Sequence, residues 1–120
     1  MSRQRDGGMA TAELAVVLPT LVLLIAAGLT MISVVLAQVR CVDAAREAAR
    51  AAARDEPAGV IRSAAIRAAP AGASVEVGGV DEEVRVTVSA RAGRVGGLLP
   101  AFRVSASAVA LREPESTGVP

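Results

Sequence analysis

The residues of this chain that could take part in chemistry stand near its N-terminal end. Gly8 directly precedes a long apolar run, and Glu13 follows Gly8 by five positions. In a secretory signal peptide the small residues at the cleavage site come after a shorter apolar region. Here Gly7 and Gly8 come before the apolar run, so a cut at this point would leave the apolar segment in the mature protein.

The composition argues against catalysis by the chain itself. Histidine, lysine and tyrosine are absent, which removes most general bases and the amine needed for Schiff-base chemistry. The net charge of +1 and the lack of tryptophan give no case for a nucleic-acid partner. We expect no enzyme activity, no catalytic residue and no bound cofactor.

Cys41 is the one cysteine of the chain, so an intrachain disulfide is impossible. Without histidine a Cys₂His₂ zinc site is excluded too, and we expect no metal ligands. Two interpretations of Cys41 remain open: a thiol that forms an intermolecular disulfide, and a small, partly buried side chain on an alanine-rich helix. We favour the second.

A long helix must position these residues. The run from Leu14 to Ala37 carries no charge and spans about 36 Å at 1.5 Å per residue, enough to cross a hydrocarbon core of roughly 30 Å. Pro19 lies near its start and is expected to kink the helix rather than break it. The helical pattern continues as a stripe of alanines: Ala45, Ala48, Ala49, Ala52 and Ala53. One helix is predicted from near Met9 to near Arg54.

The rest of the chain predicts a small α+β domain. A short helix is expected over 60–69, with Ile61, Ala64, Ala65 and Ala68 on its apolar face, and Pro70 and Gly72 are expected to end it. Alternating apolar residues predict strands around 75–77, 84–90 and 102–110, which would form a three-stranded antiparallel sheet packed near the alanine stripe. Phe102 is the chain's single aromatic residue, so we expect it to be the largest anchor of the core. The tail, 113–120, is expected to be disordered.

Three segments resemble a known family. The stretch from Gly8 to Pro19, with Glu13 between them, is similar to the processing site of type IV prepilins and to the TadE-like pilins of the tight-adherence (type IVc) pilus. The run 40–52 resembles the segment outside the membrane in actinobacterial members, and the two C-terminal strands resemble that family's C-terminal region. Leu14 stands where major pilins of this type usually carry an aromatic residue, which favours a minor subunit.

The resemblance implies a division of the chain and a set of roles. It implies a prepilin-type leader over 1–8, a transmembrane helix over 9–39 and an extracytoplasmic domain over 40–112. It also implies cleavage between Gly8 and Met9 by a prepilin peptidase. Glu13 would serve subunit assembly by meeting the freed amine of a neighbouring subunit. The implied partners are other pilin subunits, membrane lipid and the inner-membrane pilus assembly platform.

Orientation and function each leave an alternative. Counting arginines alone, Arg3 and Arg5 are outnumbered by the four that follow the apolar run, which favours an N-terminus outside. The leader resemblance requires a cytoplasmic N-terminus, and we give it precedence because those four arginines alternate with acids along one helix. The leading hypothesis is a single-pass minor pilin or pseudopilin of the cell membrane or pilus. The alternative is a monomeric, membrane-anchored extracytoplasmic binding module.

Overall fold

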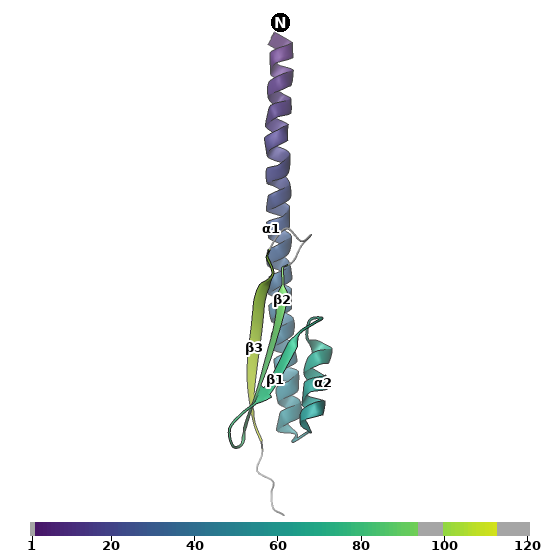
Figure 1. Cartoon of the computed structure of the whole chain (residues 1–120), viewed down its shortest axis with the longest axis vertical. Coiled ribbons are helices and arrows are strands. Elements are labelled where there is room, and N and C mark those ends of the chain that lie inside the picture. Colours follow the sequence, from purple (N-terminus) through teal and green to yellow (C-terminus); the bar gives the residue numbers. More distant parts are fainter. Residues whose placement is uncertain (1, 94–99, 113–120) are drawn as a thin grey trace, which may run out of the picture.

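The computed structural model describes residues 2–93 and 100–112, and within helix α1 it describes side chains from Gly7 onward. Its elements are α1 (Ser2–Ala53), α2 (Ala58–Ala68), β1 (Ser74–Gly78), β2 (Glu83–Ala92) and β3 (Phe102–Leu111). The predicted fold class is confirmed: one long helix, a short second helix and a three-stranded antiparallel sheet (Figure 1). The predicted tail 113–120 lies outside the described residues, as does the segment 94–99 between β2 and β3.

Helix α1 is longer at its start than the sequence predicted. It begins at Ser2 instead of near Met9. Extending an existing helix costs far less than nucleating one, so residues 2–8 join α1 although Gly7 and Gly8 are poor helix formers. The end agrees with the prediction: α1 stops at Ala53, Asp55 takes a left-handed φ of 58°, and Pro57 begins the next turn.

Helix α2 folds back against the C-terminal half of α1. The predicted helix over 60–69 is confirmed with a shift of two residues at its start. Its buried face consists of Ile61, Ala64 and Ala65, the positions that the apolar spacing indicated. Ile61 has no exposed surface. An ion pair of 3.6 Å between Arg112 Nε and Asp55 Oδ1 ties the end of β3 to the turn between the helices.

The sheet has the order β1-β2-β3, and both pairings are antiparallel. The central strand β2 buries Val84, Val86, Val88 and Ala90 on the face toward the helices. The hairpin between β1 and β2 turns at Gly79, whose φ of 148° suits glycine. A Cβ at Gly79 would also clash with the backbone carbonyl of Glu83. The register therefore follows from the alternating pattern together with this glycine turn.

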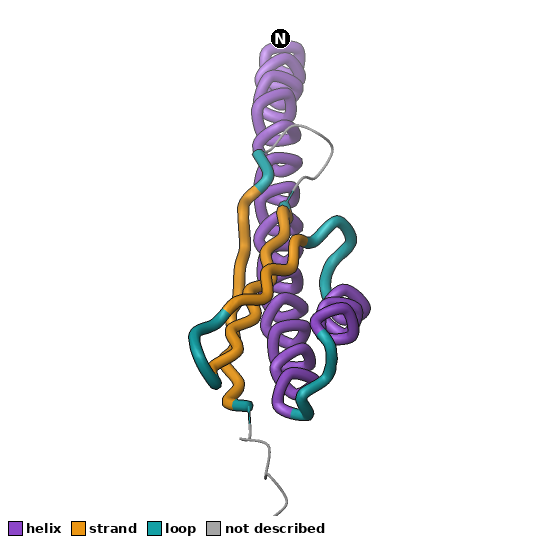
Figure 2. Tube along the Cα trace, turned by 60° about the horizontal axis from the view of Figure 1, so that its bottom comes forward, coloured by secondary structure: helices purple, strands orange, loops and turns teal. Residues whose placement is uncertain are grey.

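The core lies between the C-terminal half of α1, the sheet and α2 (Figure 2). The predicted alanine stripe does pack against the sheet, but the buried sector of α1 is wider than predicted. Ala44 and Ala51 are buried as well, whereas Ala53 is exposed. The reason is that the sheet and α2 contact α1 on two different sides, so a single stripe does not describe its buried surface.

The expectation that Phe102 anchors the core is wrong. The Phe102 side chain is 50% exposed, and the largest fully buried side chains are Ile61, Val86, Val88 and Cys41. Phe102 is the first residue of β3, an edge strand, and pairs with Ala92 at the last rung of the ladder. Helix α2 packs lower on the domain (Figure 1). The Phe102 ring lies near Gly93, where a Cβ would be 3.1 Å from Phe102 Cδ2.

Candidate functional site

The predicted cleavage residues lie in the exposed N-terminal half of α1. Gly7 and Gly8 are both exposed, and a Cβ added to either would meet no other atom within 4 Å. Packing inside the chain therefore does not require glycine at these positions. Each glycine lowers helix stability by about 1 kcal/mol relative to alanine. These positions thus weaken α1 locally beside the Gly8–Met9 bond.

Glu13 is placed one helical turn after Met9, on the same side of α1. Its side chain is exposed, and within the described residues it forms no ion pair or hydrogen bond. A carboxylate at the edge of an apolar helix is costly to hold in lipid unless it is paired. Among the side chains that the structure describes, no cation pairs with Glu13, so this carboxylate is open to an amine from another molecule.

Around and beyond Glu13, α1 presents large apolar side chains on every side. This is the one helix in the described residues that is long and apolar enough to cross a membrane. Its most apolar stretch of 18 residues has a mean hydropathy of 2.5, and 11% of that stretch is buried. The core helix of a soluble protein would be mostly buried. The same helix continues into the folded domain as its central element, and the core includes Ala37, the last residue of the apolar run.

Polar groups within the apolar part of α1 are satisfied by the helix itself. The hydroxyls of Thr20, Thr30 and Ser33 each donate to the carbonyl four residues earlier, at 2.7–2.9 Å. This is what a lipid environment demands. Pro19 leaves the carbonyl of Ala15 without its helical donor, yet α1 continues through it unbroken. A kink at Pro19 stays a prediction.

Cys41 lies in the core, under the sheet, with no exposed surface. Burial raises the pKa of its thiol above the ordinary value, because the thiolate is poorly solvated there. An intermolecular disulfide would require the domain to open first. The geometry favours the structural role for Cys41 over the intermolecular one.

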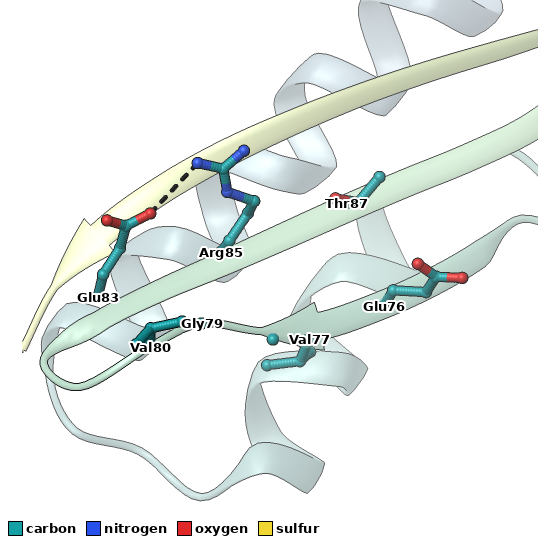
Figure 3. A pocket seen from close by; sticks show the side chains of 8 residues that line it. Glu76, Val77, Gly79, Val80, Glu83, Arg85 and Thr87 are labelled. Carbon is teal, nitrogen blue, oxygen red and sulfur yellow. Dashed lines mark hydrogen bonds and ion pairs between the residues drawn. The ribbon is translucent and has the colours of Figure 1, made fainter.

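The described hollows of the sheet are open to solvent. One of about 500 Å³ lies over the β1–β2 hairpin and is lined by Glu76, Glu83, Arg85, Thr87 and the hairpin residues 77–80 (Figure 3). Its charged groups Arg85 and Glu83 pair with each other at 3.3 Å on the surface. Within the described residues no three acidic or thiol side chains gather to hold a metal ion.

Comparisons with known proteins agree with this picture. Residues 8–50 match the family described as TadE-like protein. The chain is 44% identical over 108 residues to the Mycobacterium tuberculosis (strain H37Rv) protein named Apoptosis inhibitor Rv3655c, covering 88% of this chain and 80% of the relative. This chain belongs to the TadE-like family. That family is a structural one, associated with the Tad pilus. No solved structure matches the chain.

The matched region of this TadE-like chain begins at Gly8 and contains Glu13, Pro19 and Cys41. Sequence reasoning missed one contact within it: the end of the sheet lies against Thr30 and Val34, inside the apolar run. It also missed the hydrogen bond of 3.0 Å that the Gln38 side chain donates to the carbonyl of Ser105. Thr30 and Gln38 are polar residues two turns apart on one side of an apolar helix, and that spacing was the available signal.

Proposed function

We propose that this chain is a minor pilin or pseudopilin subunit of a tight-adherence pilus, held in the cell membrane by α1 with its N-terminus in the cytoplasm. A prepilin peptidase removes residues 1–8, and the chain then packs through α1 against other pilin subunits in the membrane and the growing filament. It performs no catalysis. The observation that carries the proposal is the combination, within one TadE-like helix, of exposed Gly8 and Met9 residues and an exposed Glu13 that has no ion pair among the described residues, ahead of an exposed apolar segment.

The lateral surface for assembly is the exposed apolar half of α1. Small residues at Ala26, Ala27 and Gly28 allow another helix to approach closely, and a Cβ on Gly28 would meet nothing in this chain. The large side chains on the other sides of the helix face lipid until assembly covers them. The inner-membrane assembly platform is the partner that would extract the subunit from the bilayer.

Cleavage can be tested with a matched pair of variants, Gly8→Ala and Gly7→Ala. Both add one methyl group in open space on the same helix and stabilise that helix by about the same amount, roughly 1 kcal/mol. We expect Gly7→Ala to be processed and Gly8→Ala to remain uncut, as measured by intact mass of protein from native membranes. Equal processing of the two variants would show that Gly8 is not the recognised residue.

Assembly can be tested at Glu13. Glu13→Ala should still be cleaved but should fail to enter surface filaments, because the freed Met9 amine of a neighbour would lose its partner. Removing one member of a desolvated ion pair costs roughly 3–5 kcal/mol. The control is Glu47→Ala on the same helix, whose surface ion pair with Arg50 at 3.6 Å contributes little. Normal amounts of the Glu13→Ala chain in sheared filaments would show that Glu13 has no role in assembly and only lies in the lipid headgroup region.

The same experiments separate this proposal from a monomeric membrane-anchored binding module. Such a module would keep its N-terminal residues and would tolerate Glu13→Ala. Its binding surface would lie in the sheet domain, where the hollow over the β1–β2 hairpin is open and its charged groups Arg85 and Glu83 pair with each other.

A further inference from the structure

The end of the sheet lies beside the apolar segment of α1 rather than beyond it. Gly93 follows β2, and a Cβ at Gly93 would lie 3.0 Å from Thr30 Cγ2 and 3.1 Å from Val34 Cγ2. Both helix residues belong to the uncharged run that ends at Ala37. Figure 1 shows the ends of β2 and β3 reaching up along α1, with the N-terminal half of the helix projecting past them.

This contact limits where a bilayer can lie along α1. A sheet end with exposed backbone groups cannot enter the hydrocarbon core. Every residue from Gly7 to Ile25 is exposed, and Thr30 is the first buried one. The stretch 9–29 spans about 31 Å as a helix, which matches a hydrocarbon core of roughly 30 Å. The hydrocarbon boundary on the side of the domain therefore falls near Thr30, with the sheet end in the headgroup layer.

Two arginines stand at this end of the sheet. Arg91 and Arg103 are direct cross-strand partners, one rung before the last pair of the ladder. Both are exposed, and they alternate with the buried Ala90 and Val104, so they share the sheet face that points away from α1. Like charges directly opposite each other destabilise a strand pair. Within the described residues neither arginine forms an ion pair.

The surroundings of the two arginines suit an anion. They border a pocket of about 270 Å³ whose other lining residues include Ser74 and Ser89. The acids Asp81, Glu82 and Glu83 lie at the other end of the strands, around the β1–β2 hairpin. Arg85 and Arg112 also lie at that far end, where they partly offset these acids, whereas Arg91 and Arg103 have no acidic partner among the described residues.

We propose that Arg91 and Arg103 bind the phosphate groups of anionic lipids in the leaflet that the sheet domain faces. A strand advances about 3.3 Å per residue, which keeps both arginines within a headgroup layer roughly 5–8 Å thick. The half-exposed Phe102 ring, one rung closer to the bilayer, rests in the interface. The proposal shortens the span predicted over 9–39 at its outer end. It rests on insertion of α1 into a membrane and on neither processing nor pilus assembly.

The test uses the full chain carrying Phe102→Trp, which supplies a single tryptophan because the chain has none. The protein is reconstituted into vesicles of phosphatidylcholine and phosphatidylglycerol in equal parts, with brominated acyl chains on one lipid or the other. We expect the brominated phosphatidylglycerol to quench the fluorescence several times more efficiently than the brominated phosphatidylcholine. Each arginine near an anionic surface favours association about fivefold. Adding Arg91→Gln and Arg103→Gln should bring the two lipids to parity.

The control removes the same charge elsewhere. Arg46→Gln with Arg62→Gln changes two exposed arginines, of which Arg46 lies about 18 Å along α1 from Val34. This pair should leave the lipid preference intact. As a second measurement, the unaltered chain released from the same lipid mixture should retain phosphatidylglycerol over phosphatidylcholine in native mass spectrometry.

Three results would overturn the proposal: equal quenching by the two lipids with both arginines present, no quenching by either, or a preference that survives the Arg91→Gln, Arg103→Gln change. The vesicles contain no peptidase and no other subunit. Failure here would therefore leave cleavage at Gly8 and the role of Glu13 untouched.

Discussion

Truncating the largest side chain of the core tests how this alanine-rich domain is held together. Ile61 on α2 has no exposed surface. Ile61→Ala removes three carbons, each worth about 0.8 kcal/mol of transfer free energy, or roughly 2.4 kcal/mol together. The cavity left behind adds about 1 kcal/mol, because the neighbouring alanines have no flexible side chains with which to fill it. The expected loss is about 3.5 kcal/mol of unfolding free energy.

Cys41 makes this loss measurable in the intact chain in a bilayer. Its thiol is fully buried, so a maleimide reacts with it only when the domain opens. When reclosing is fast, the alkylation rate follows the population of the open form. Since 1.4 kcal/mol is a factor of ten, Ile61→Ala should raise the rate several hundredfold, up to the limit set by the urea-unfolded chain.

The matched control is Ile66→Ala on the same helix. Ile66 is 55% exposed, so the same chemical change there should alter the alkylation rate only a few-fold. Similar rates for the two variants would refute the packing described for α2. A wild-type Cys41 that reacts as fast as in the unfolded chain would refute the burial of Cys41 itself.

Two further predictions concern Phe102 and Cys41. Phe102→Ala should cost about 2 kcal/mol, roughly half the value for a fully buried phenylalanine, and so should raise the alkylation rate less than Ile61→Ala does; a larger effect would contradict the observed exposure of the ring. Burial raises the pKa of Cys41 above the ordinary 9.0, so stability is full below about pH 9 and falls as the pH rises, because the unfolded chain releases its proton first. Because histidine, lysine and tyrosine are absent, the urea midpoint of the Cys41→Ala variant should stay nearly constant between about pH 9 and 11. A midpoint that still declines with pH in this variant would exclude the thiol as the cause.

Local patterns in the sequence predicted the elements well. The alternation of Val84, Val86 and Val88 with polar residues identified the central strand, and the spacing of Ile61, Ala64 and Ala65 identified the buried face of α2. These patterns are set by residues close together in the sequence. The exposure of Phe102 is set by the tertiary arrangement instead, because it depends on how far the sheet extends along α1 and on where α2 ends.

The candidate site, too, has features that the sequence predicted and features that only the structure shows. Gly8 and Glu13 were identified by their spacing and by the family resemblance, and the structure adds that both are exposed and that Glu13 has no partner in the described residues. The pairing of Arg91 with Arg103 could follow from strand register alone. Their position beside the apolar run could not, because it is fixed by the contact of Gly93 with α1, which no sequence period encodes.

The most direct test of the central claim is the N-terminus of the mature chain in its native membrane. Intact mass should be compared between cells with an active prepilin peptidase and cells from which the peptidase has been deleted. We predict that the chain begins at Met9 in the first and retains residues 1–8 in the second. A chain that still begins at Met1 or Ser2 when the peptidase is active would contradict the assignment as a processed pilin subunit.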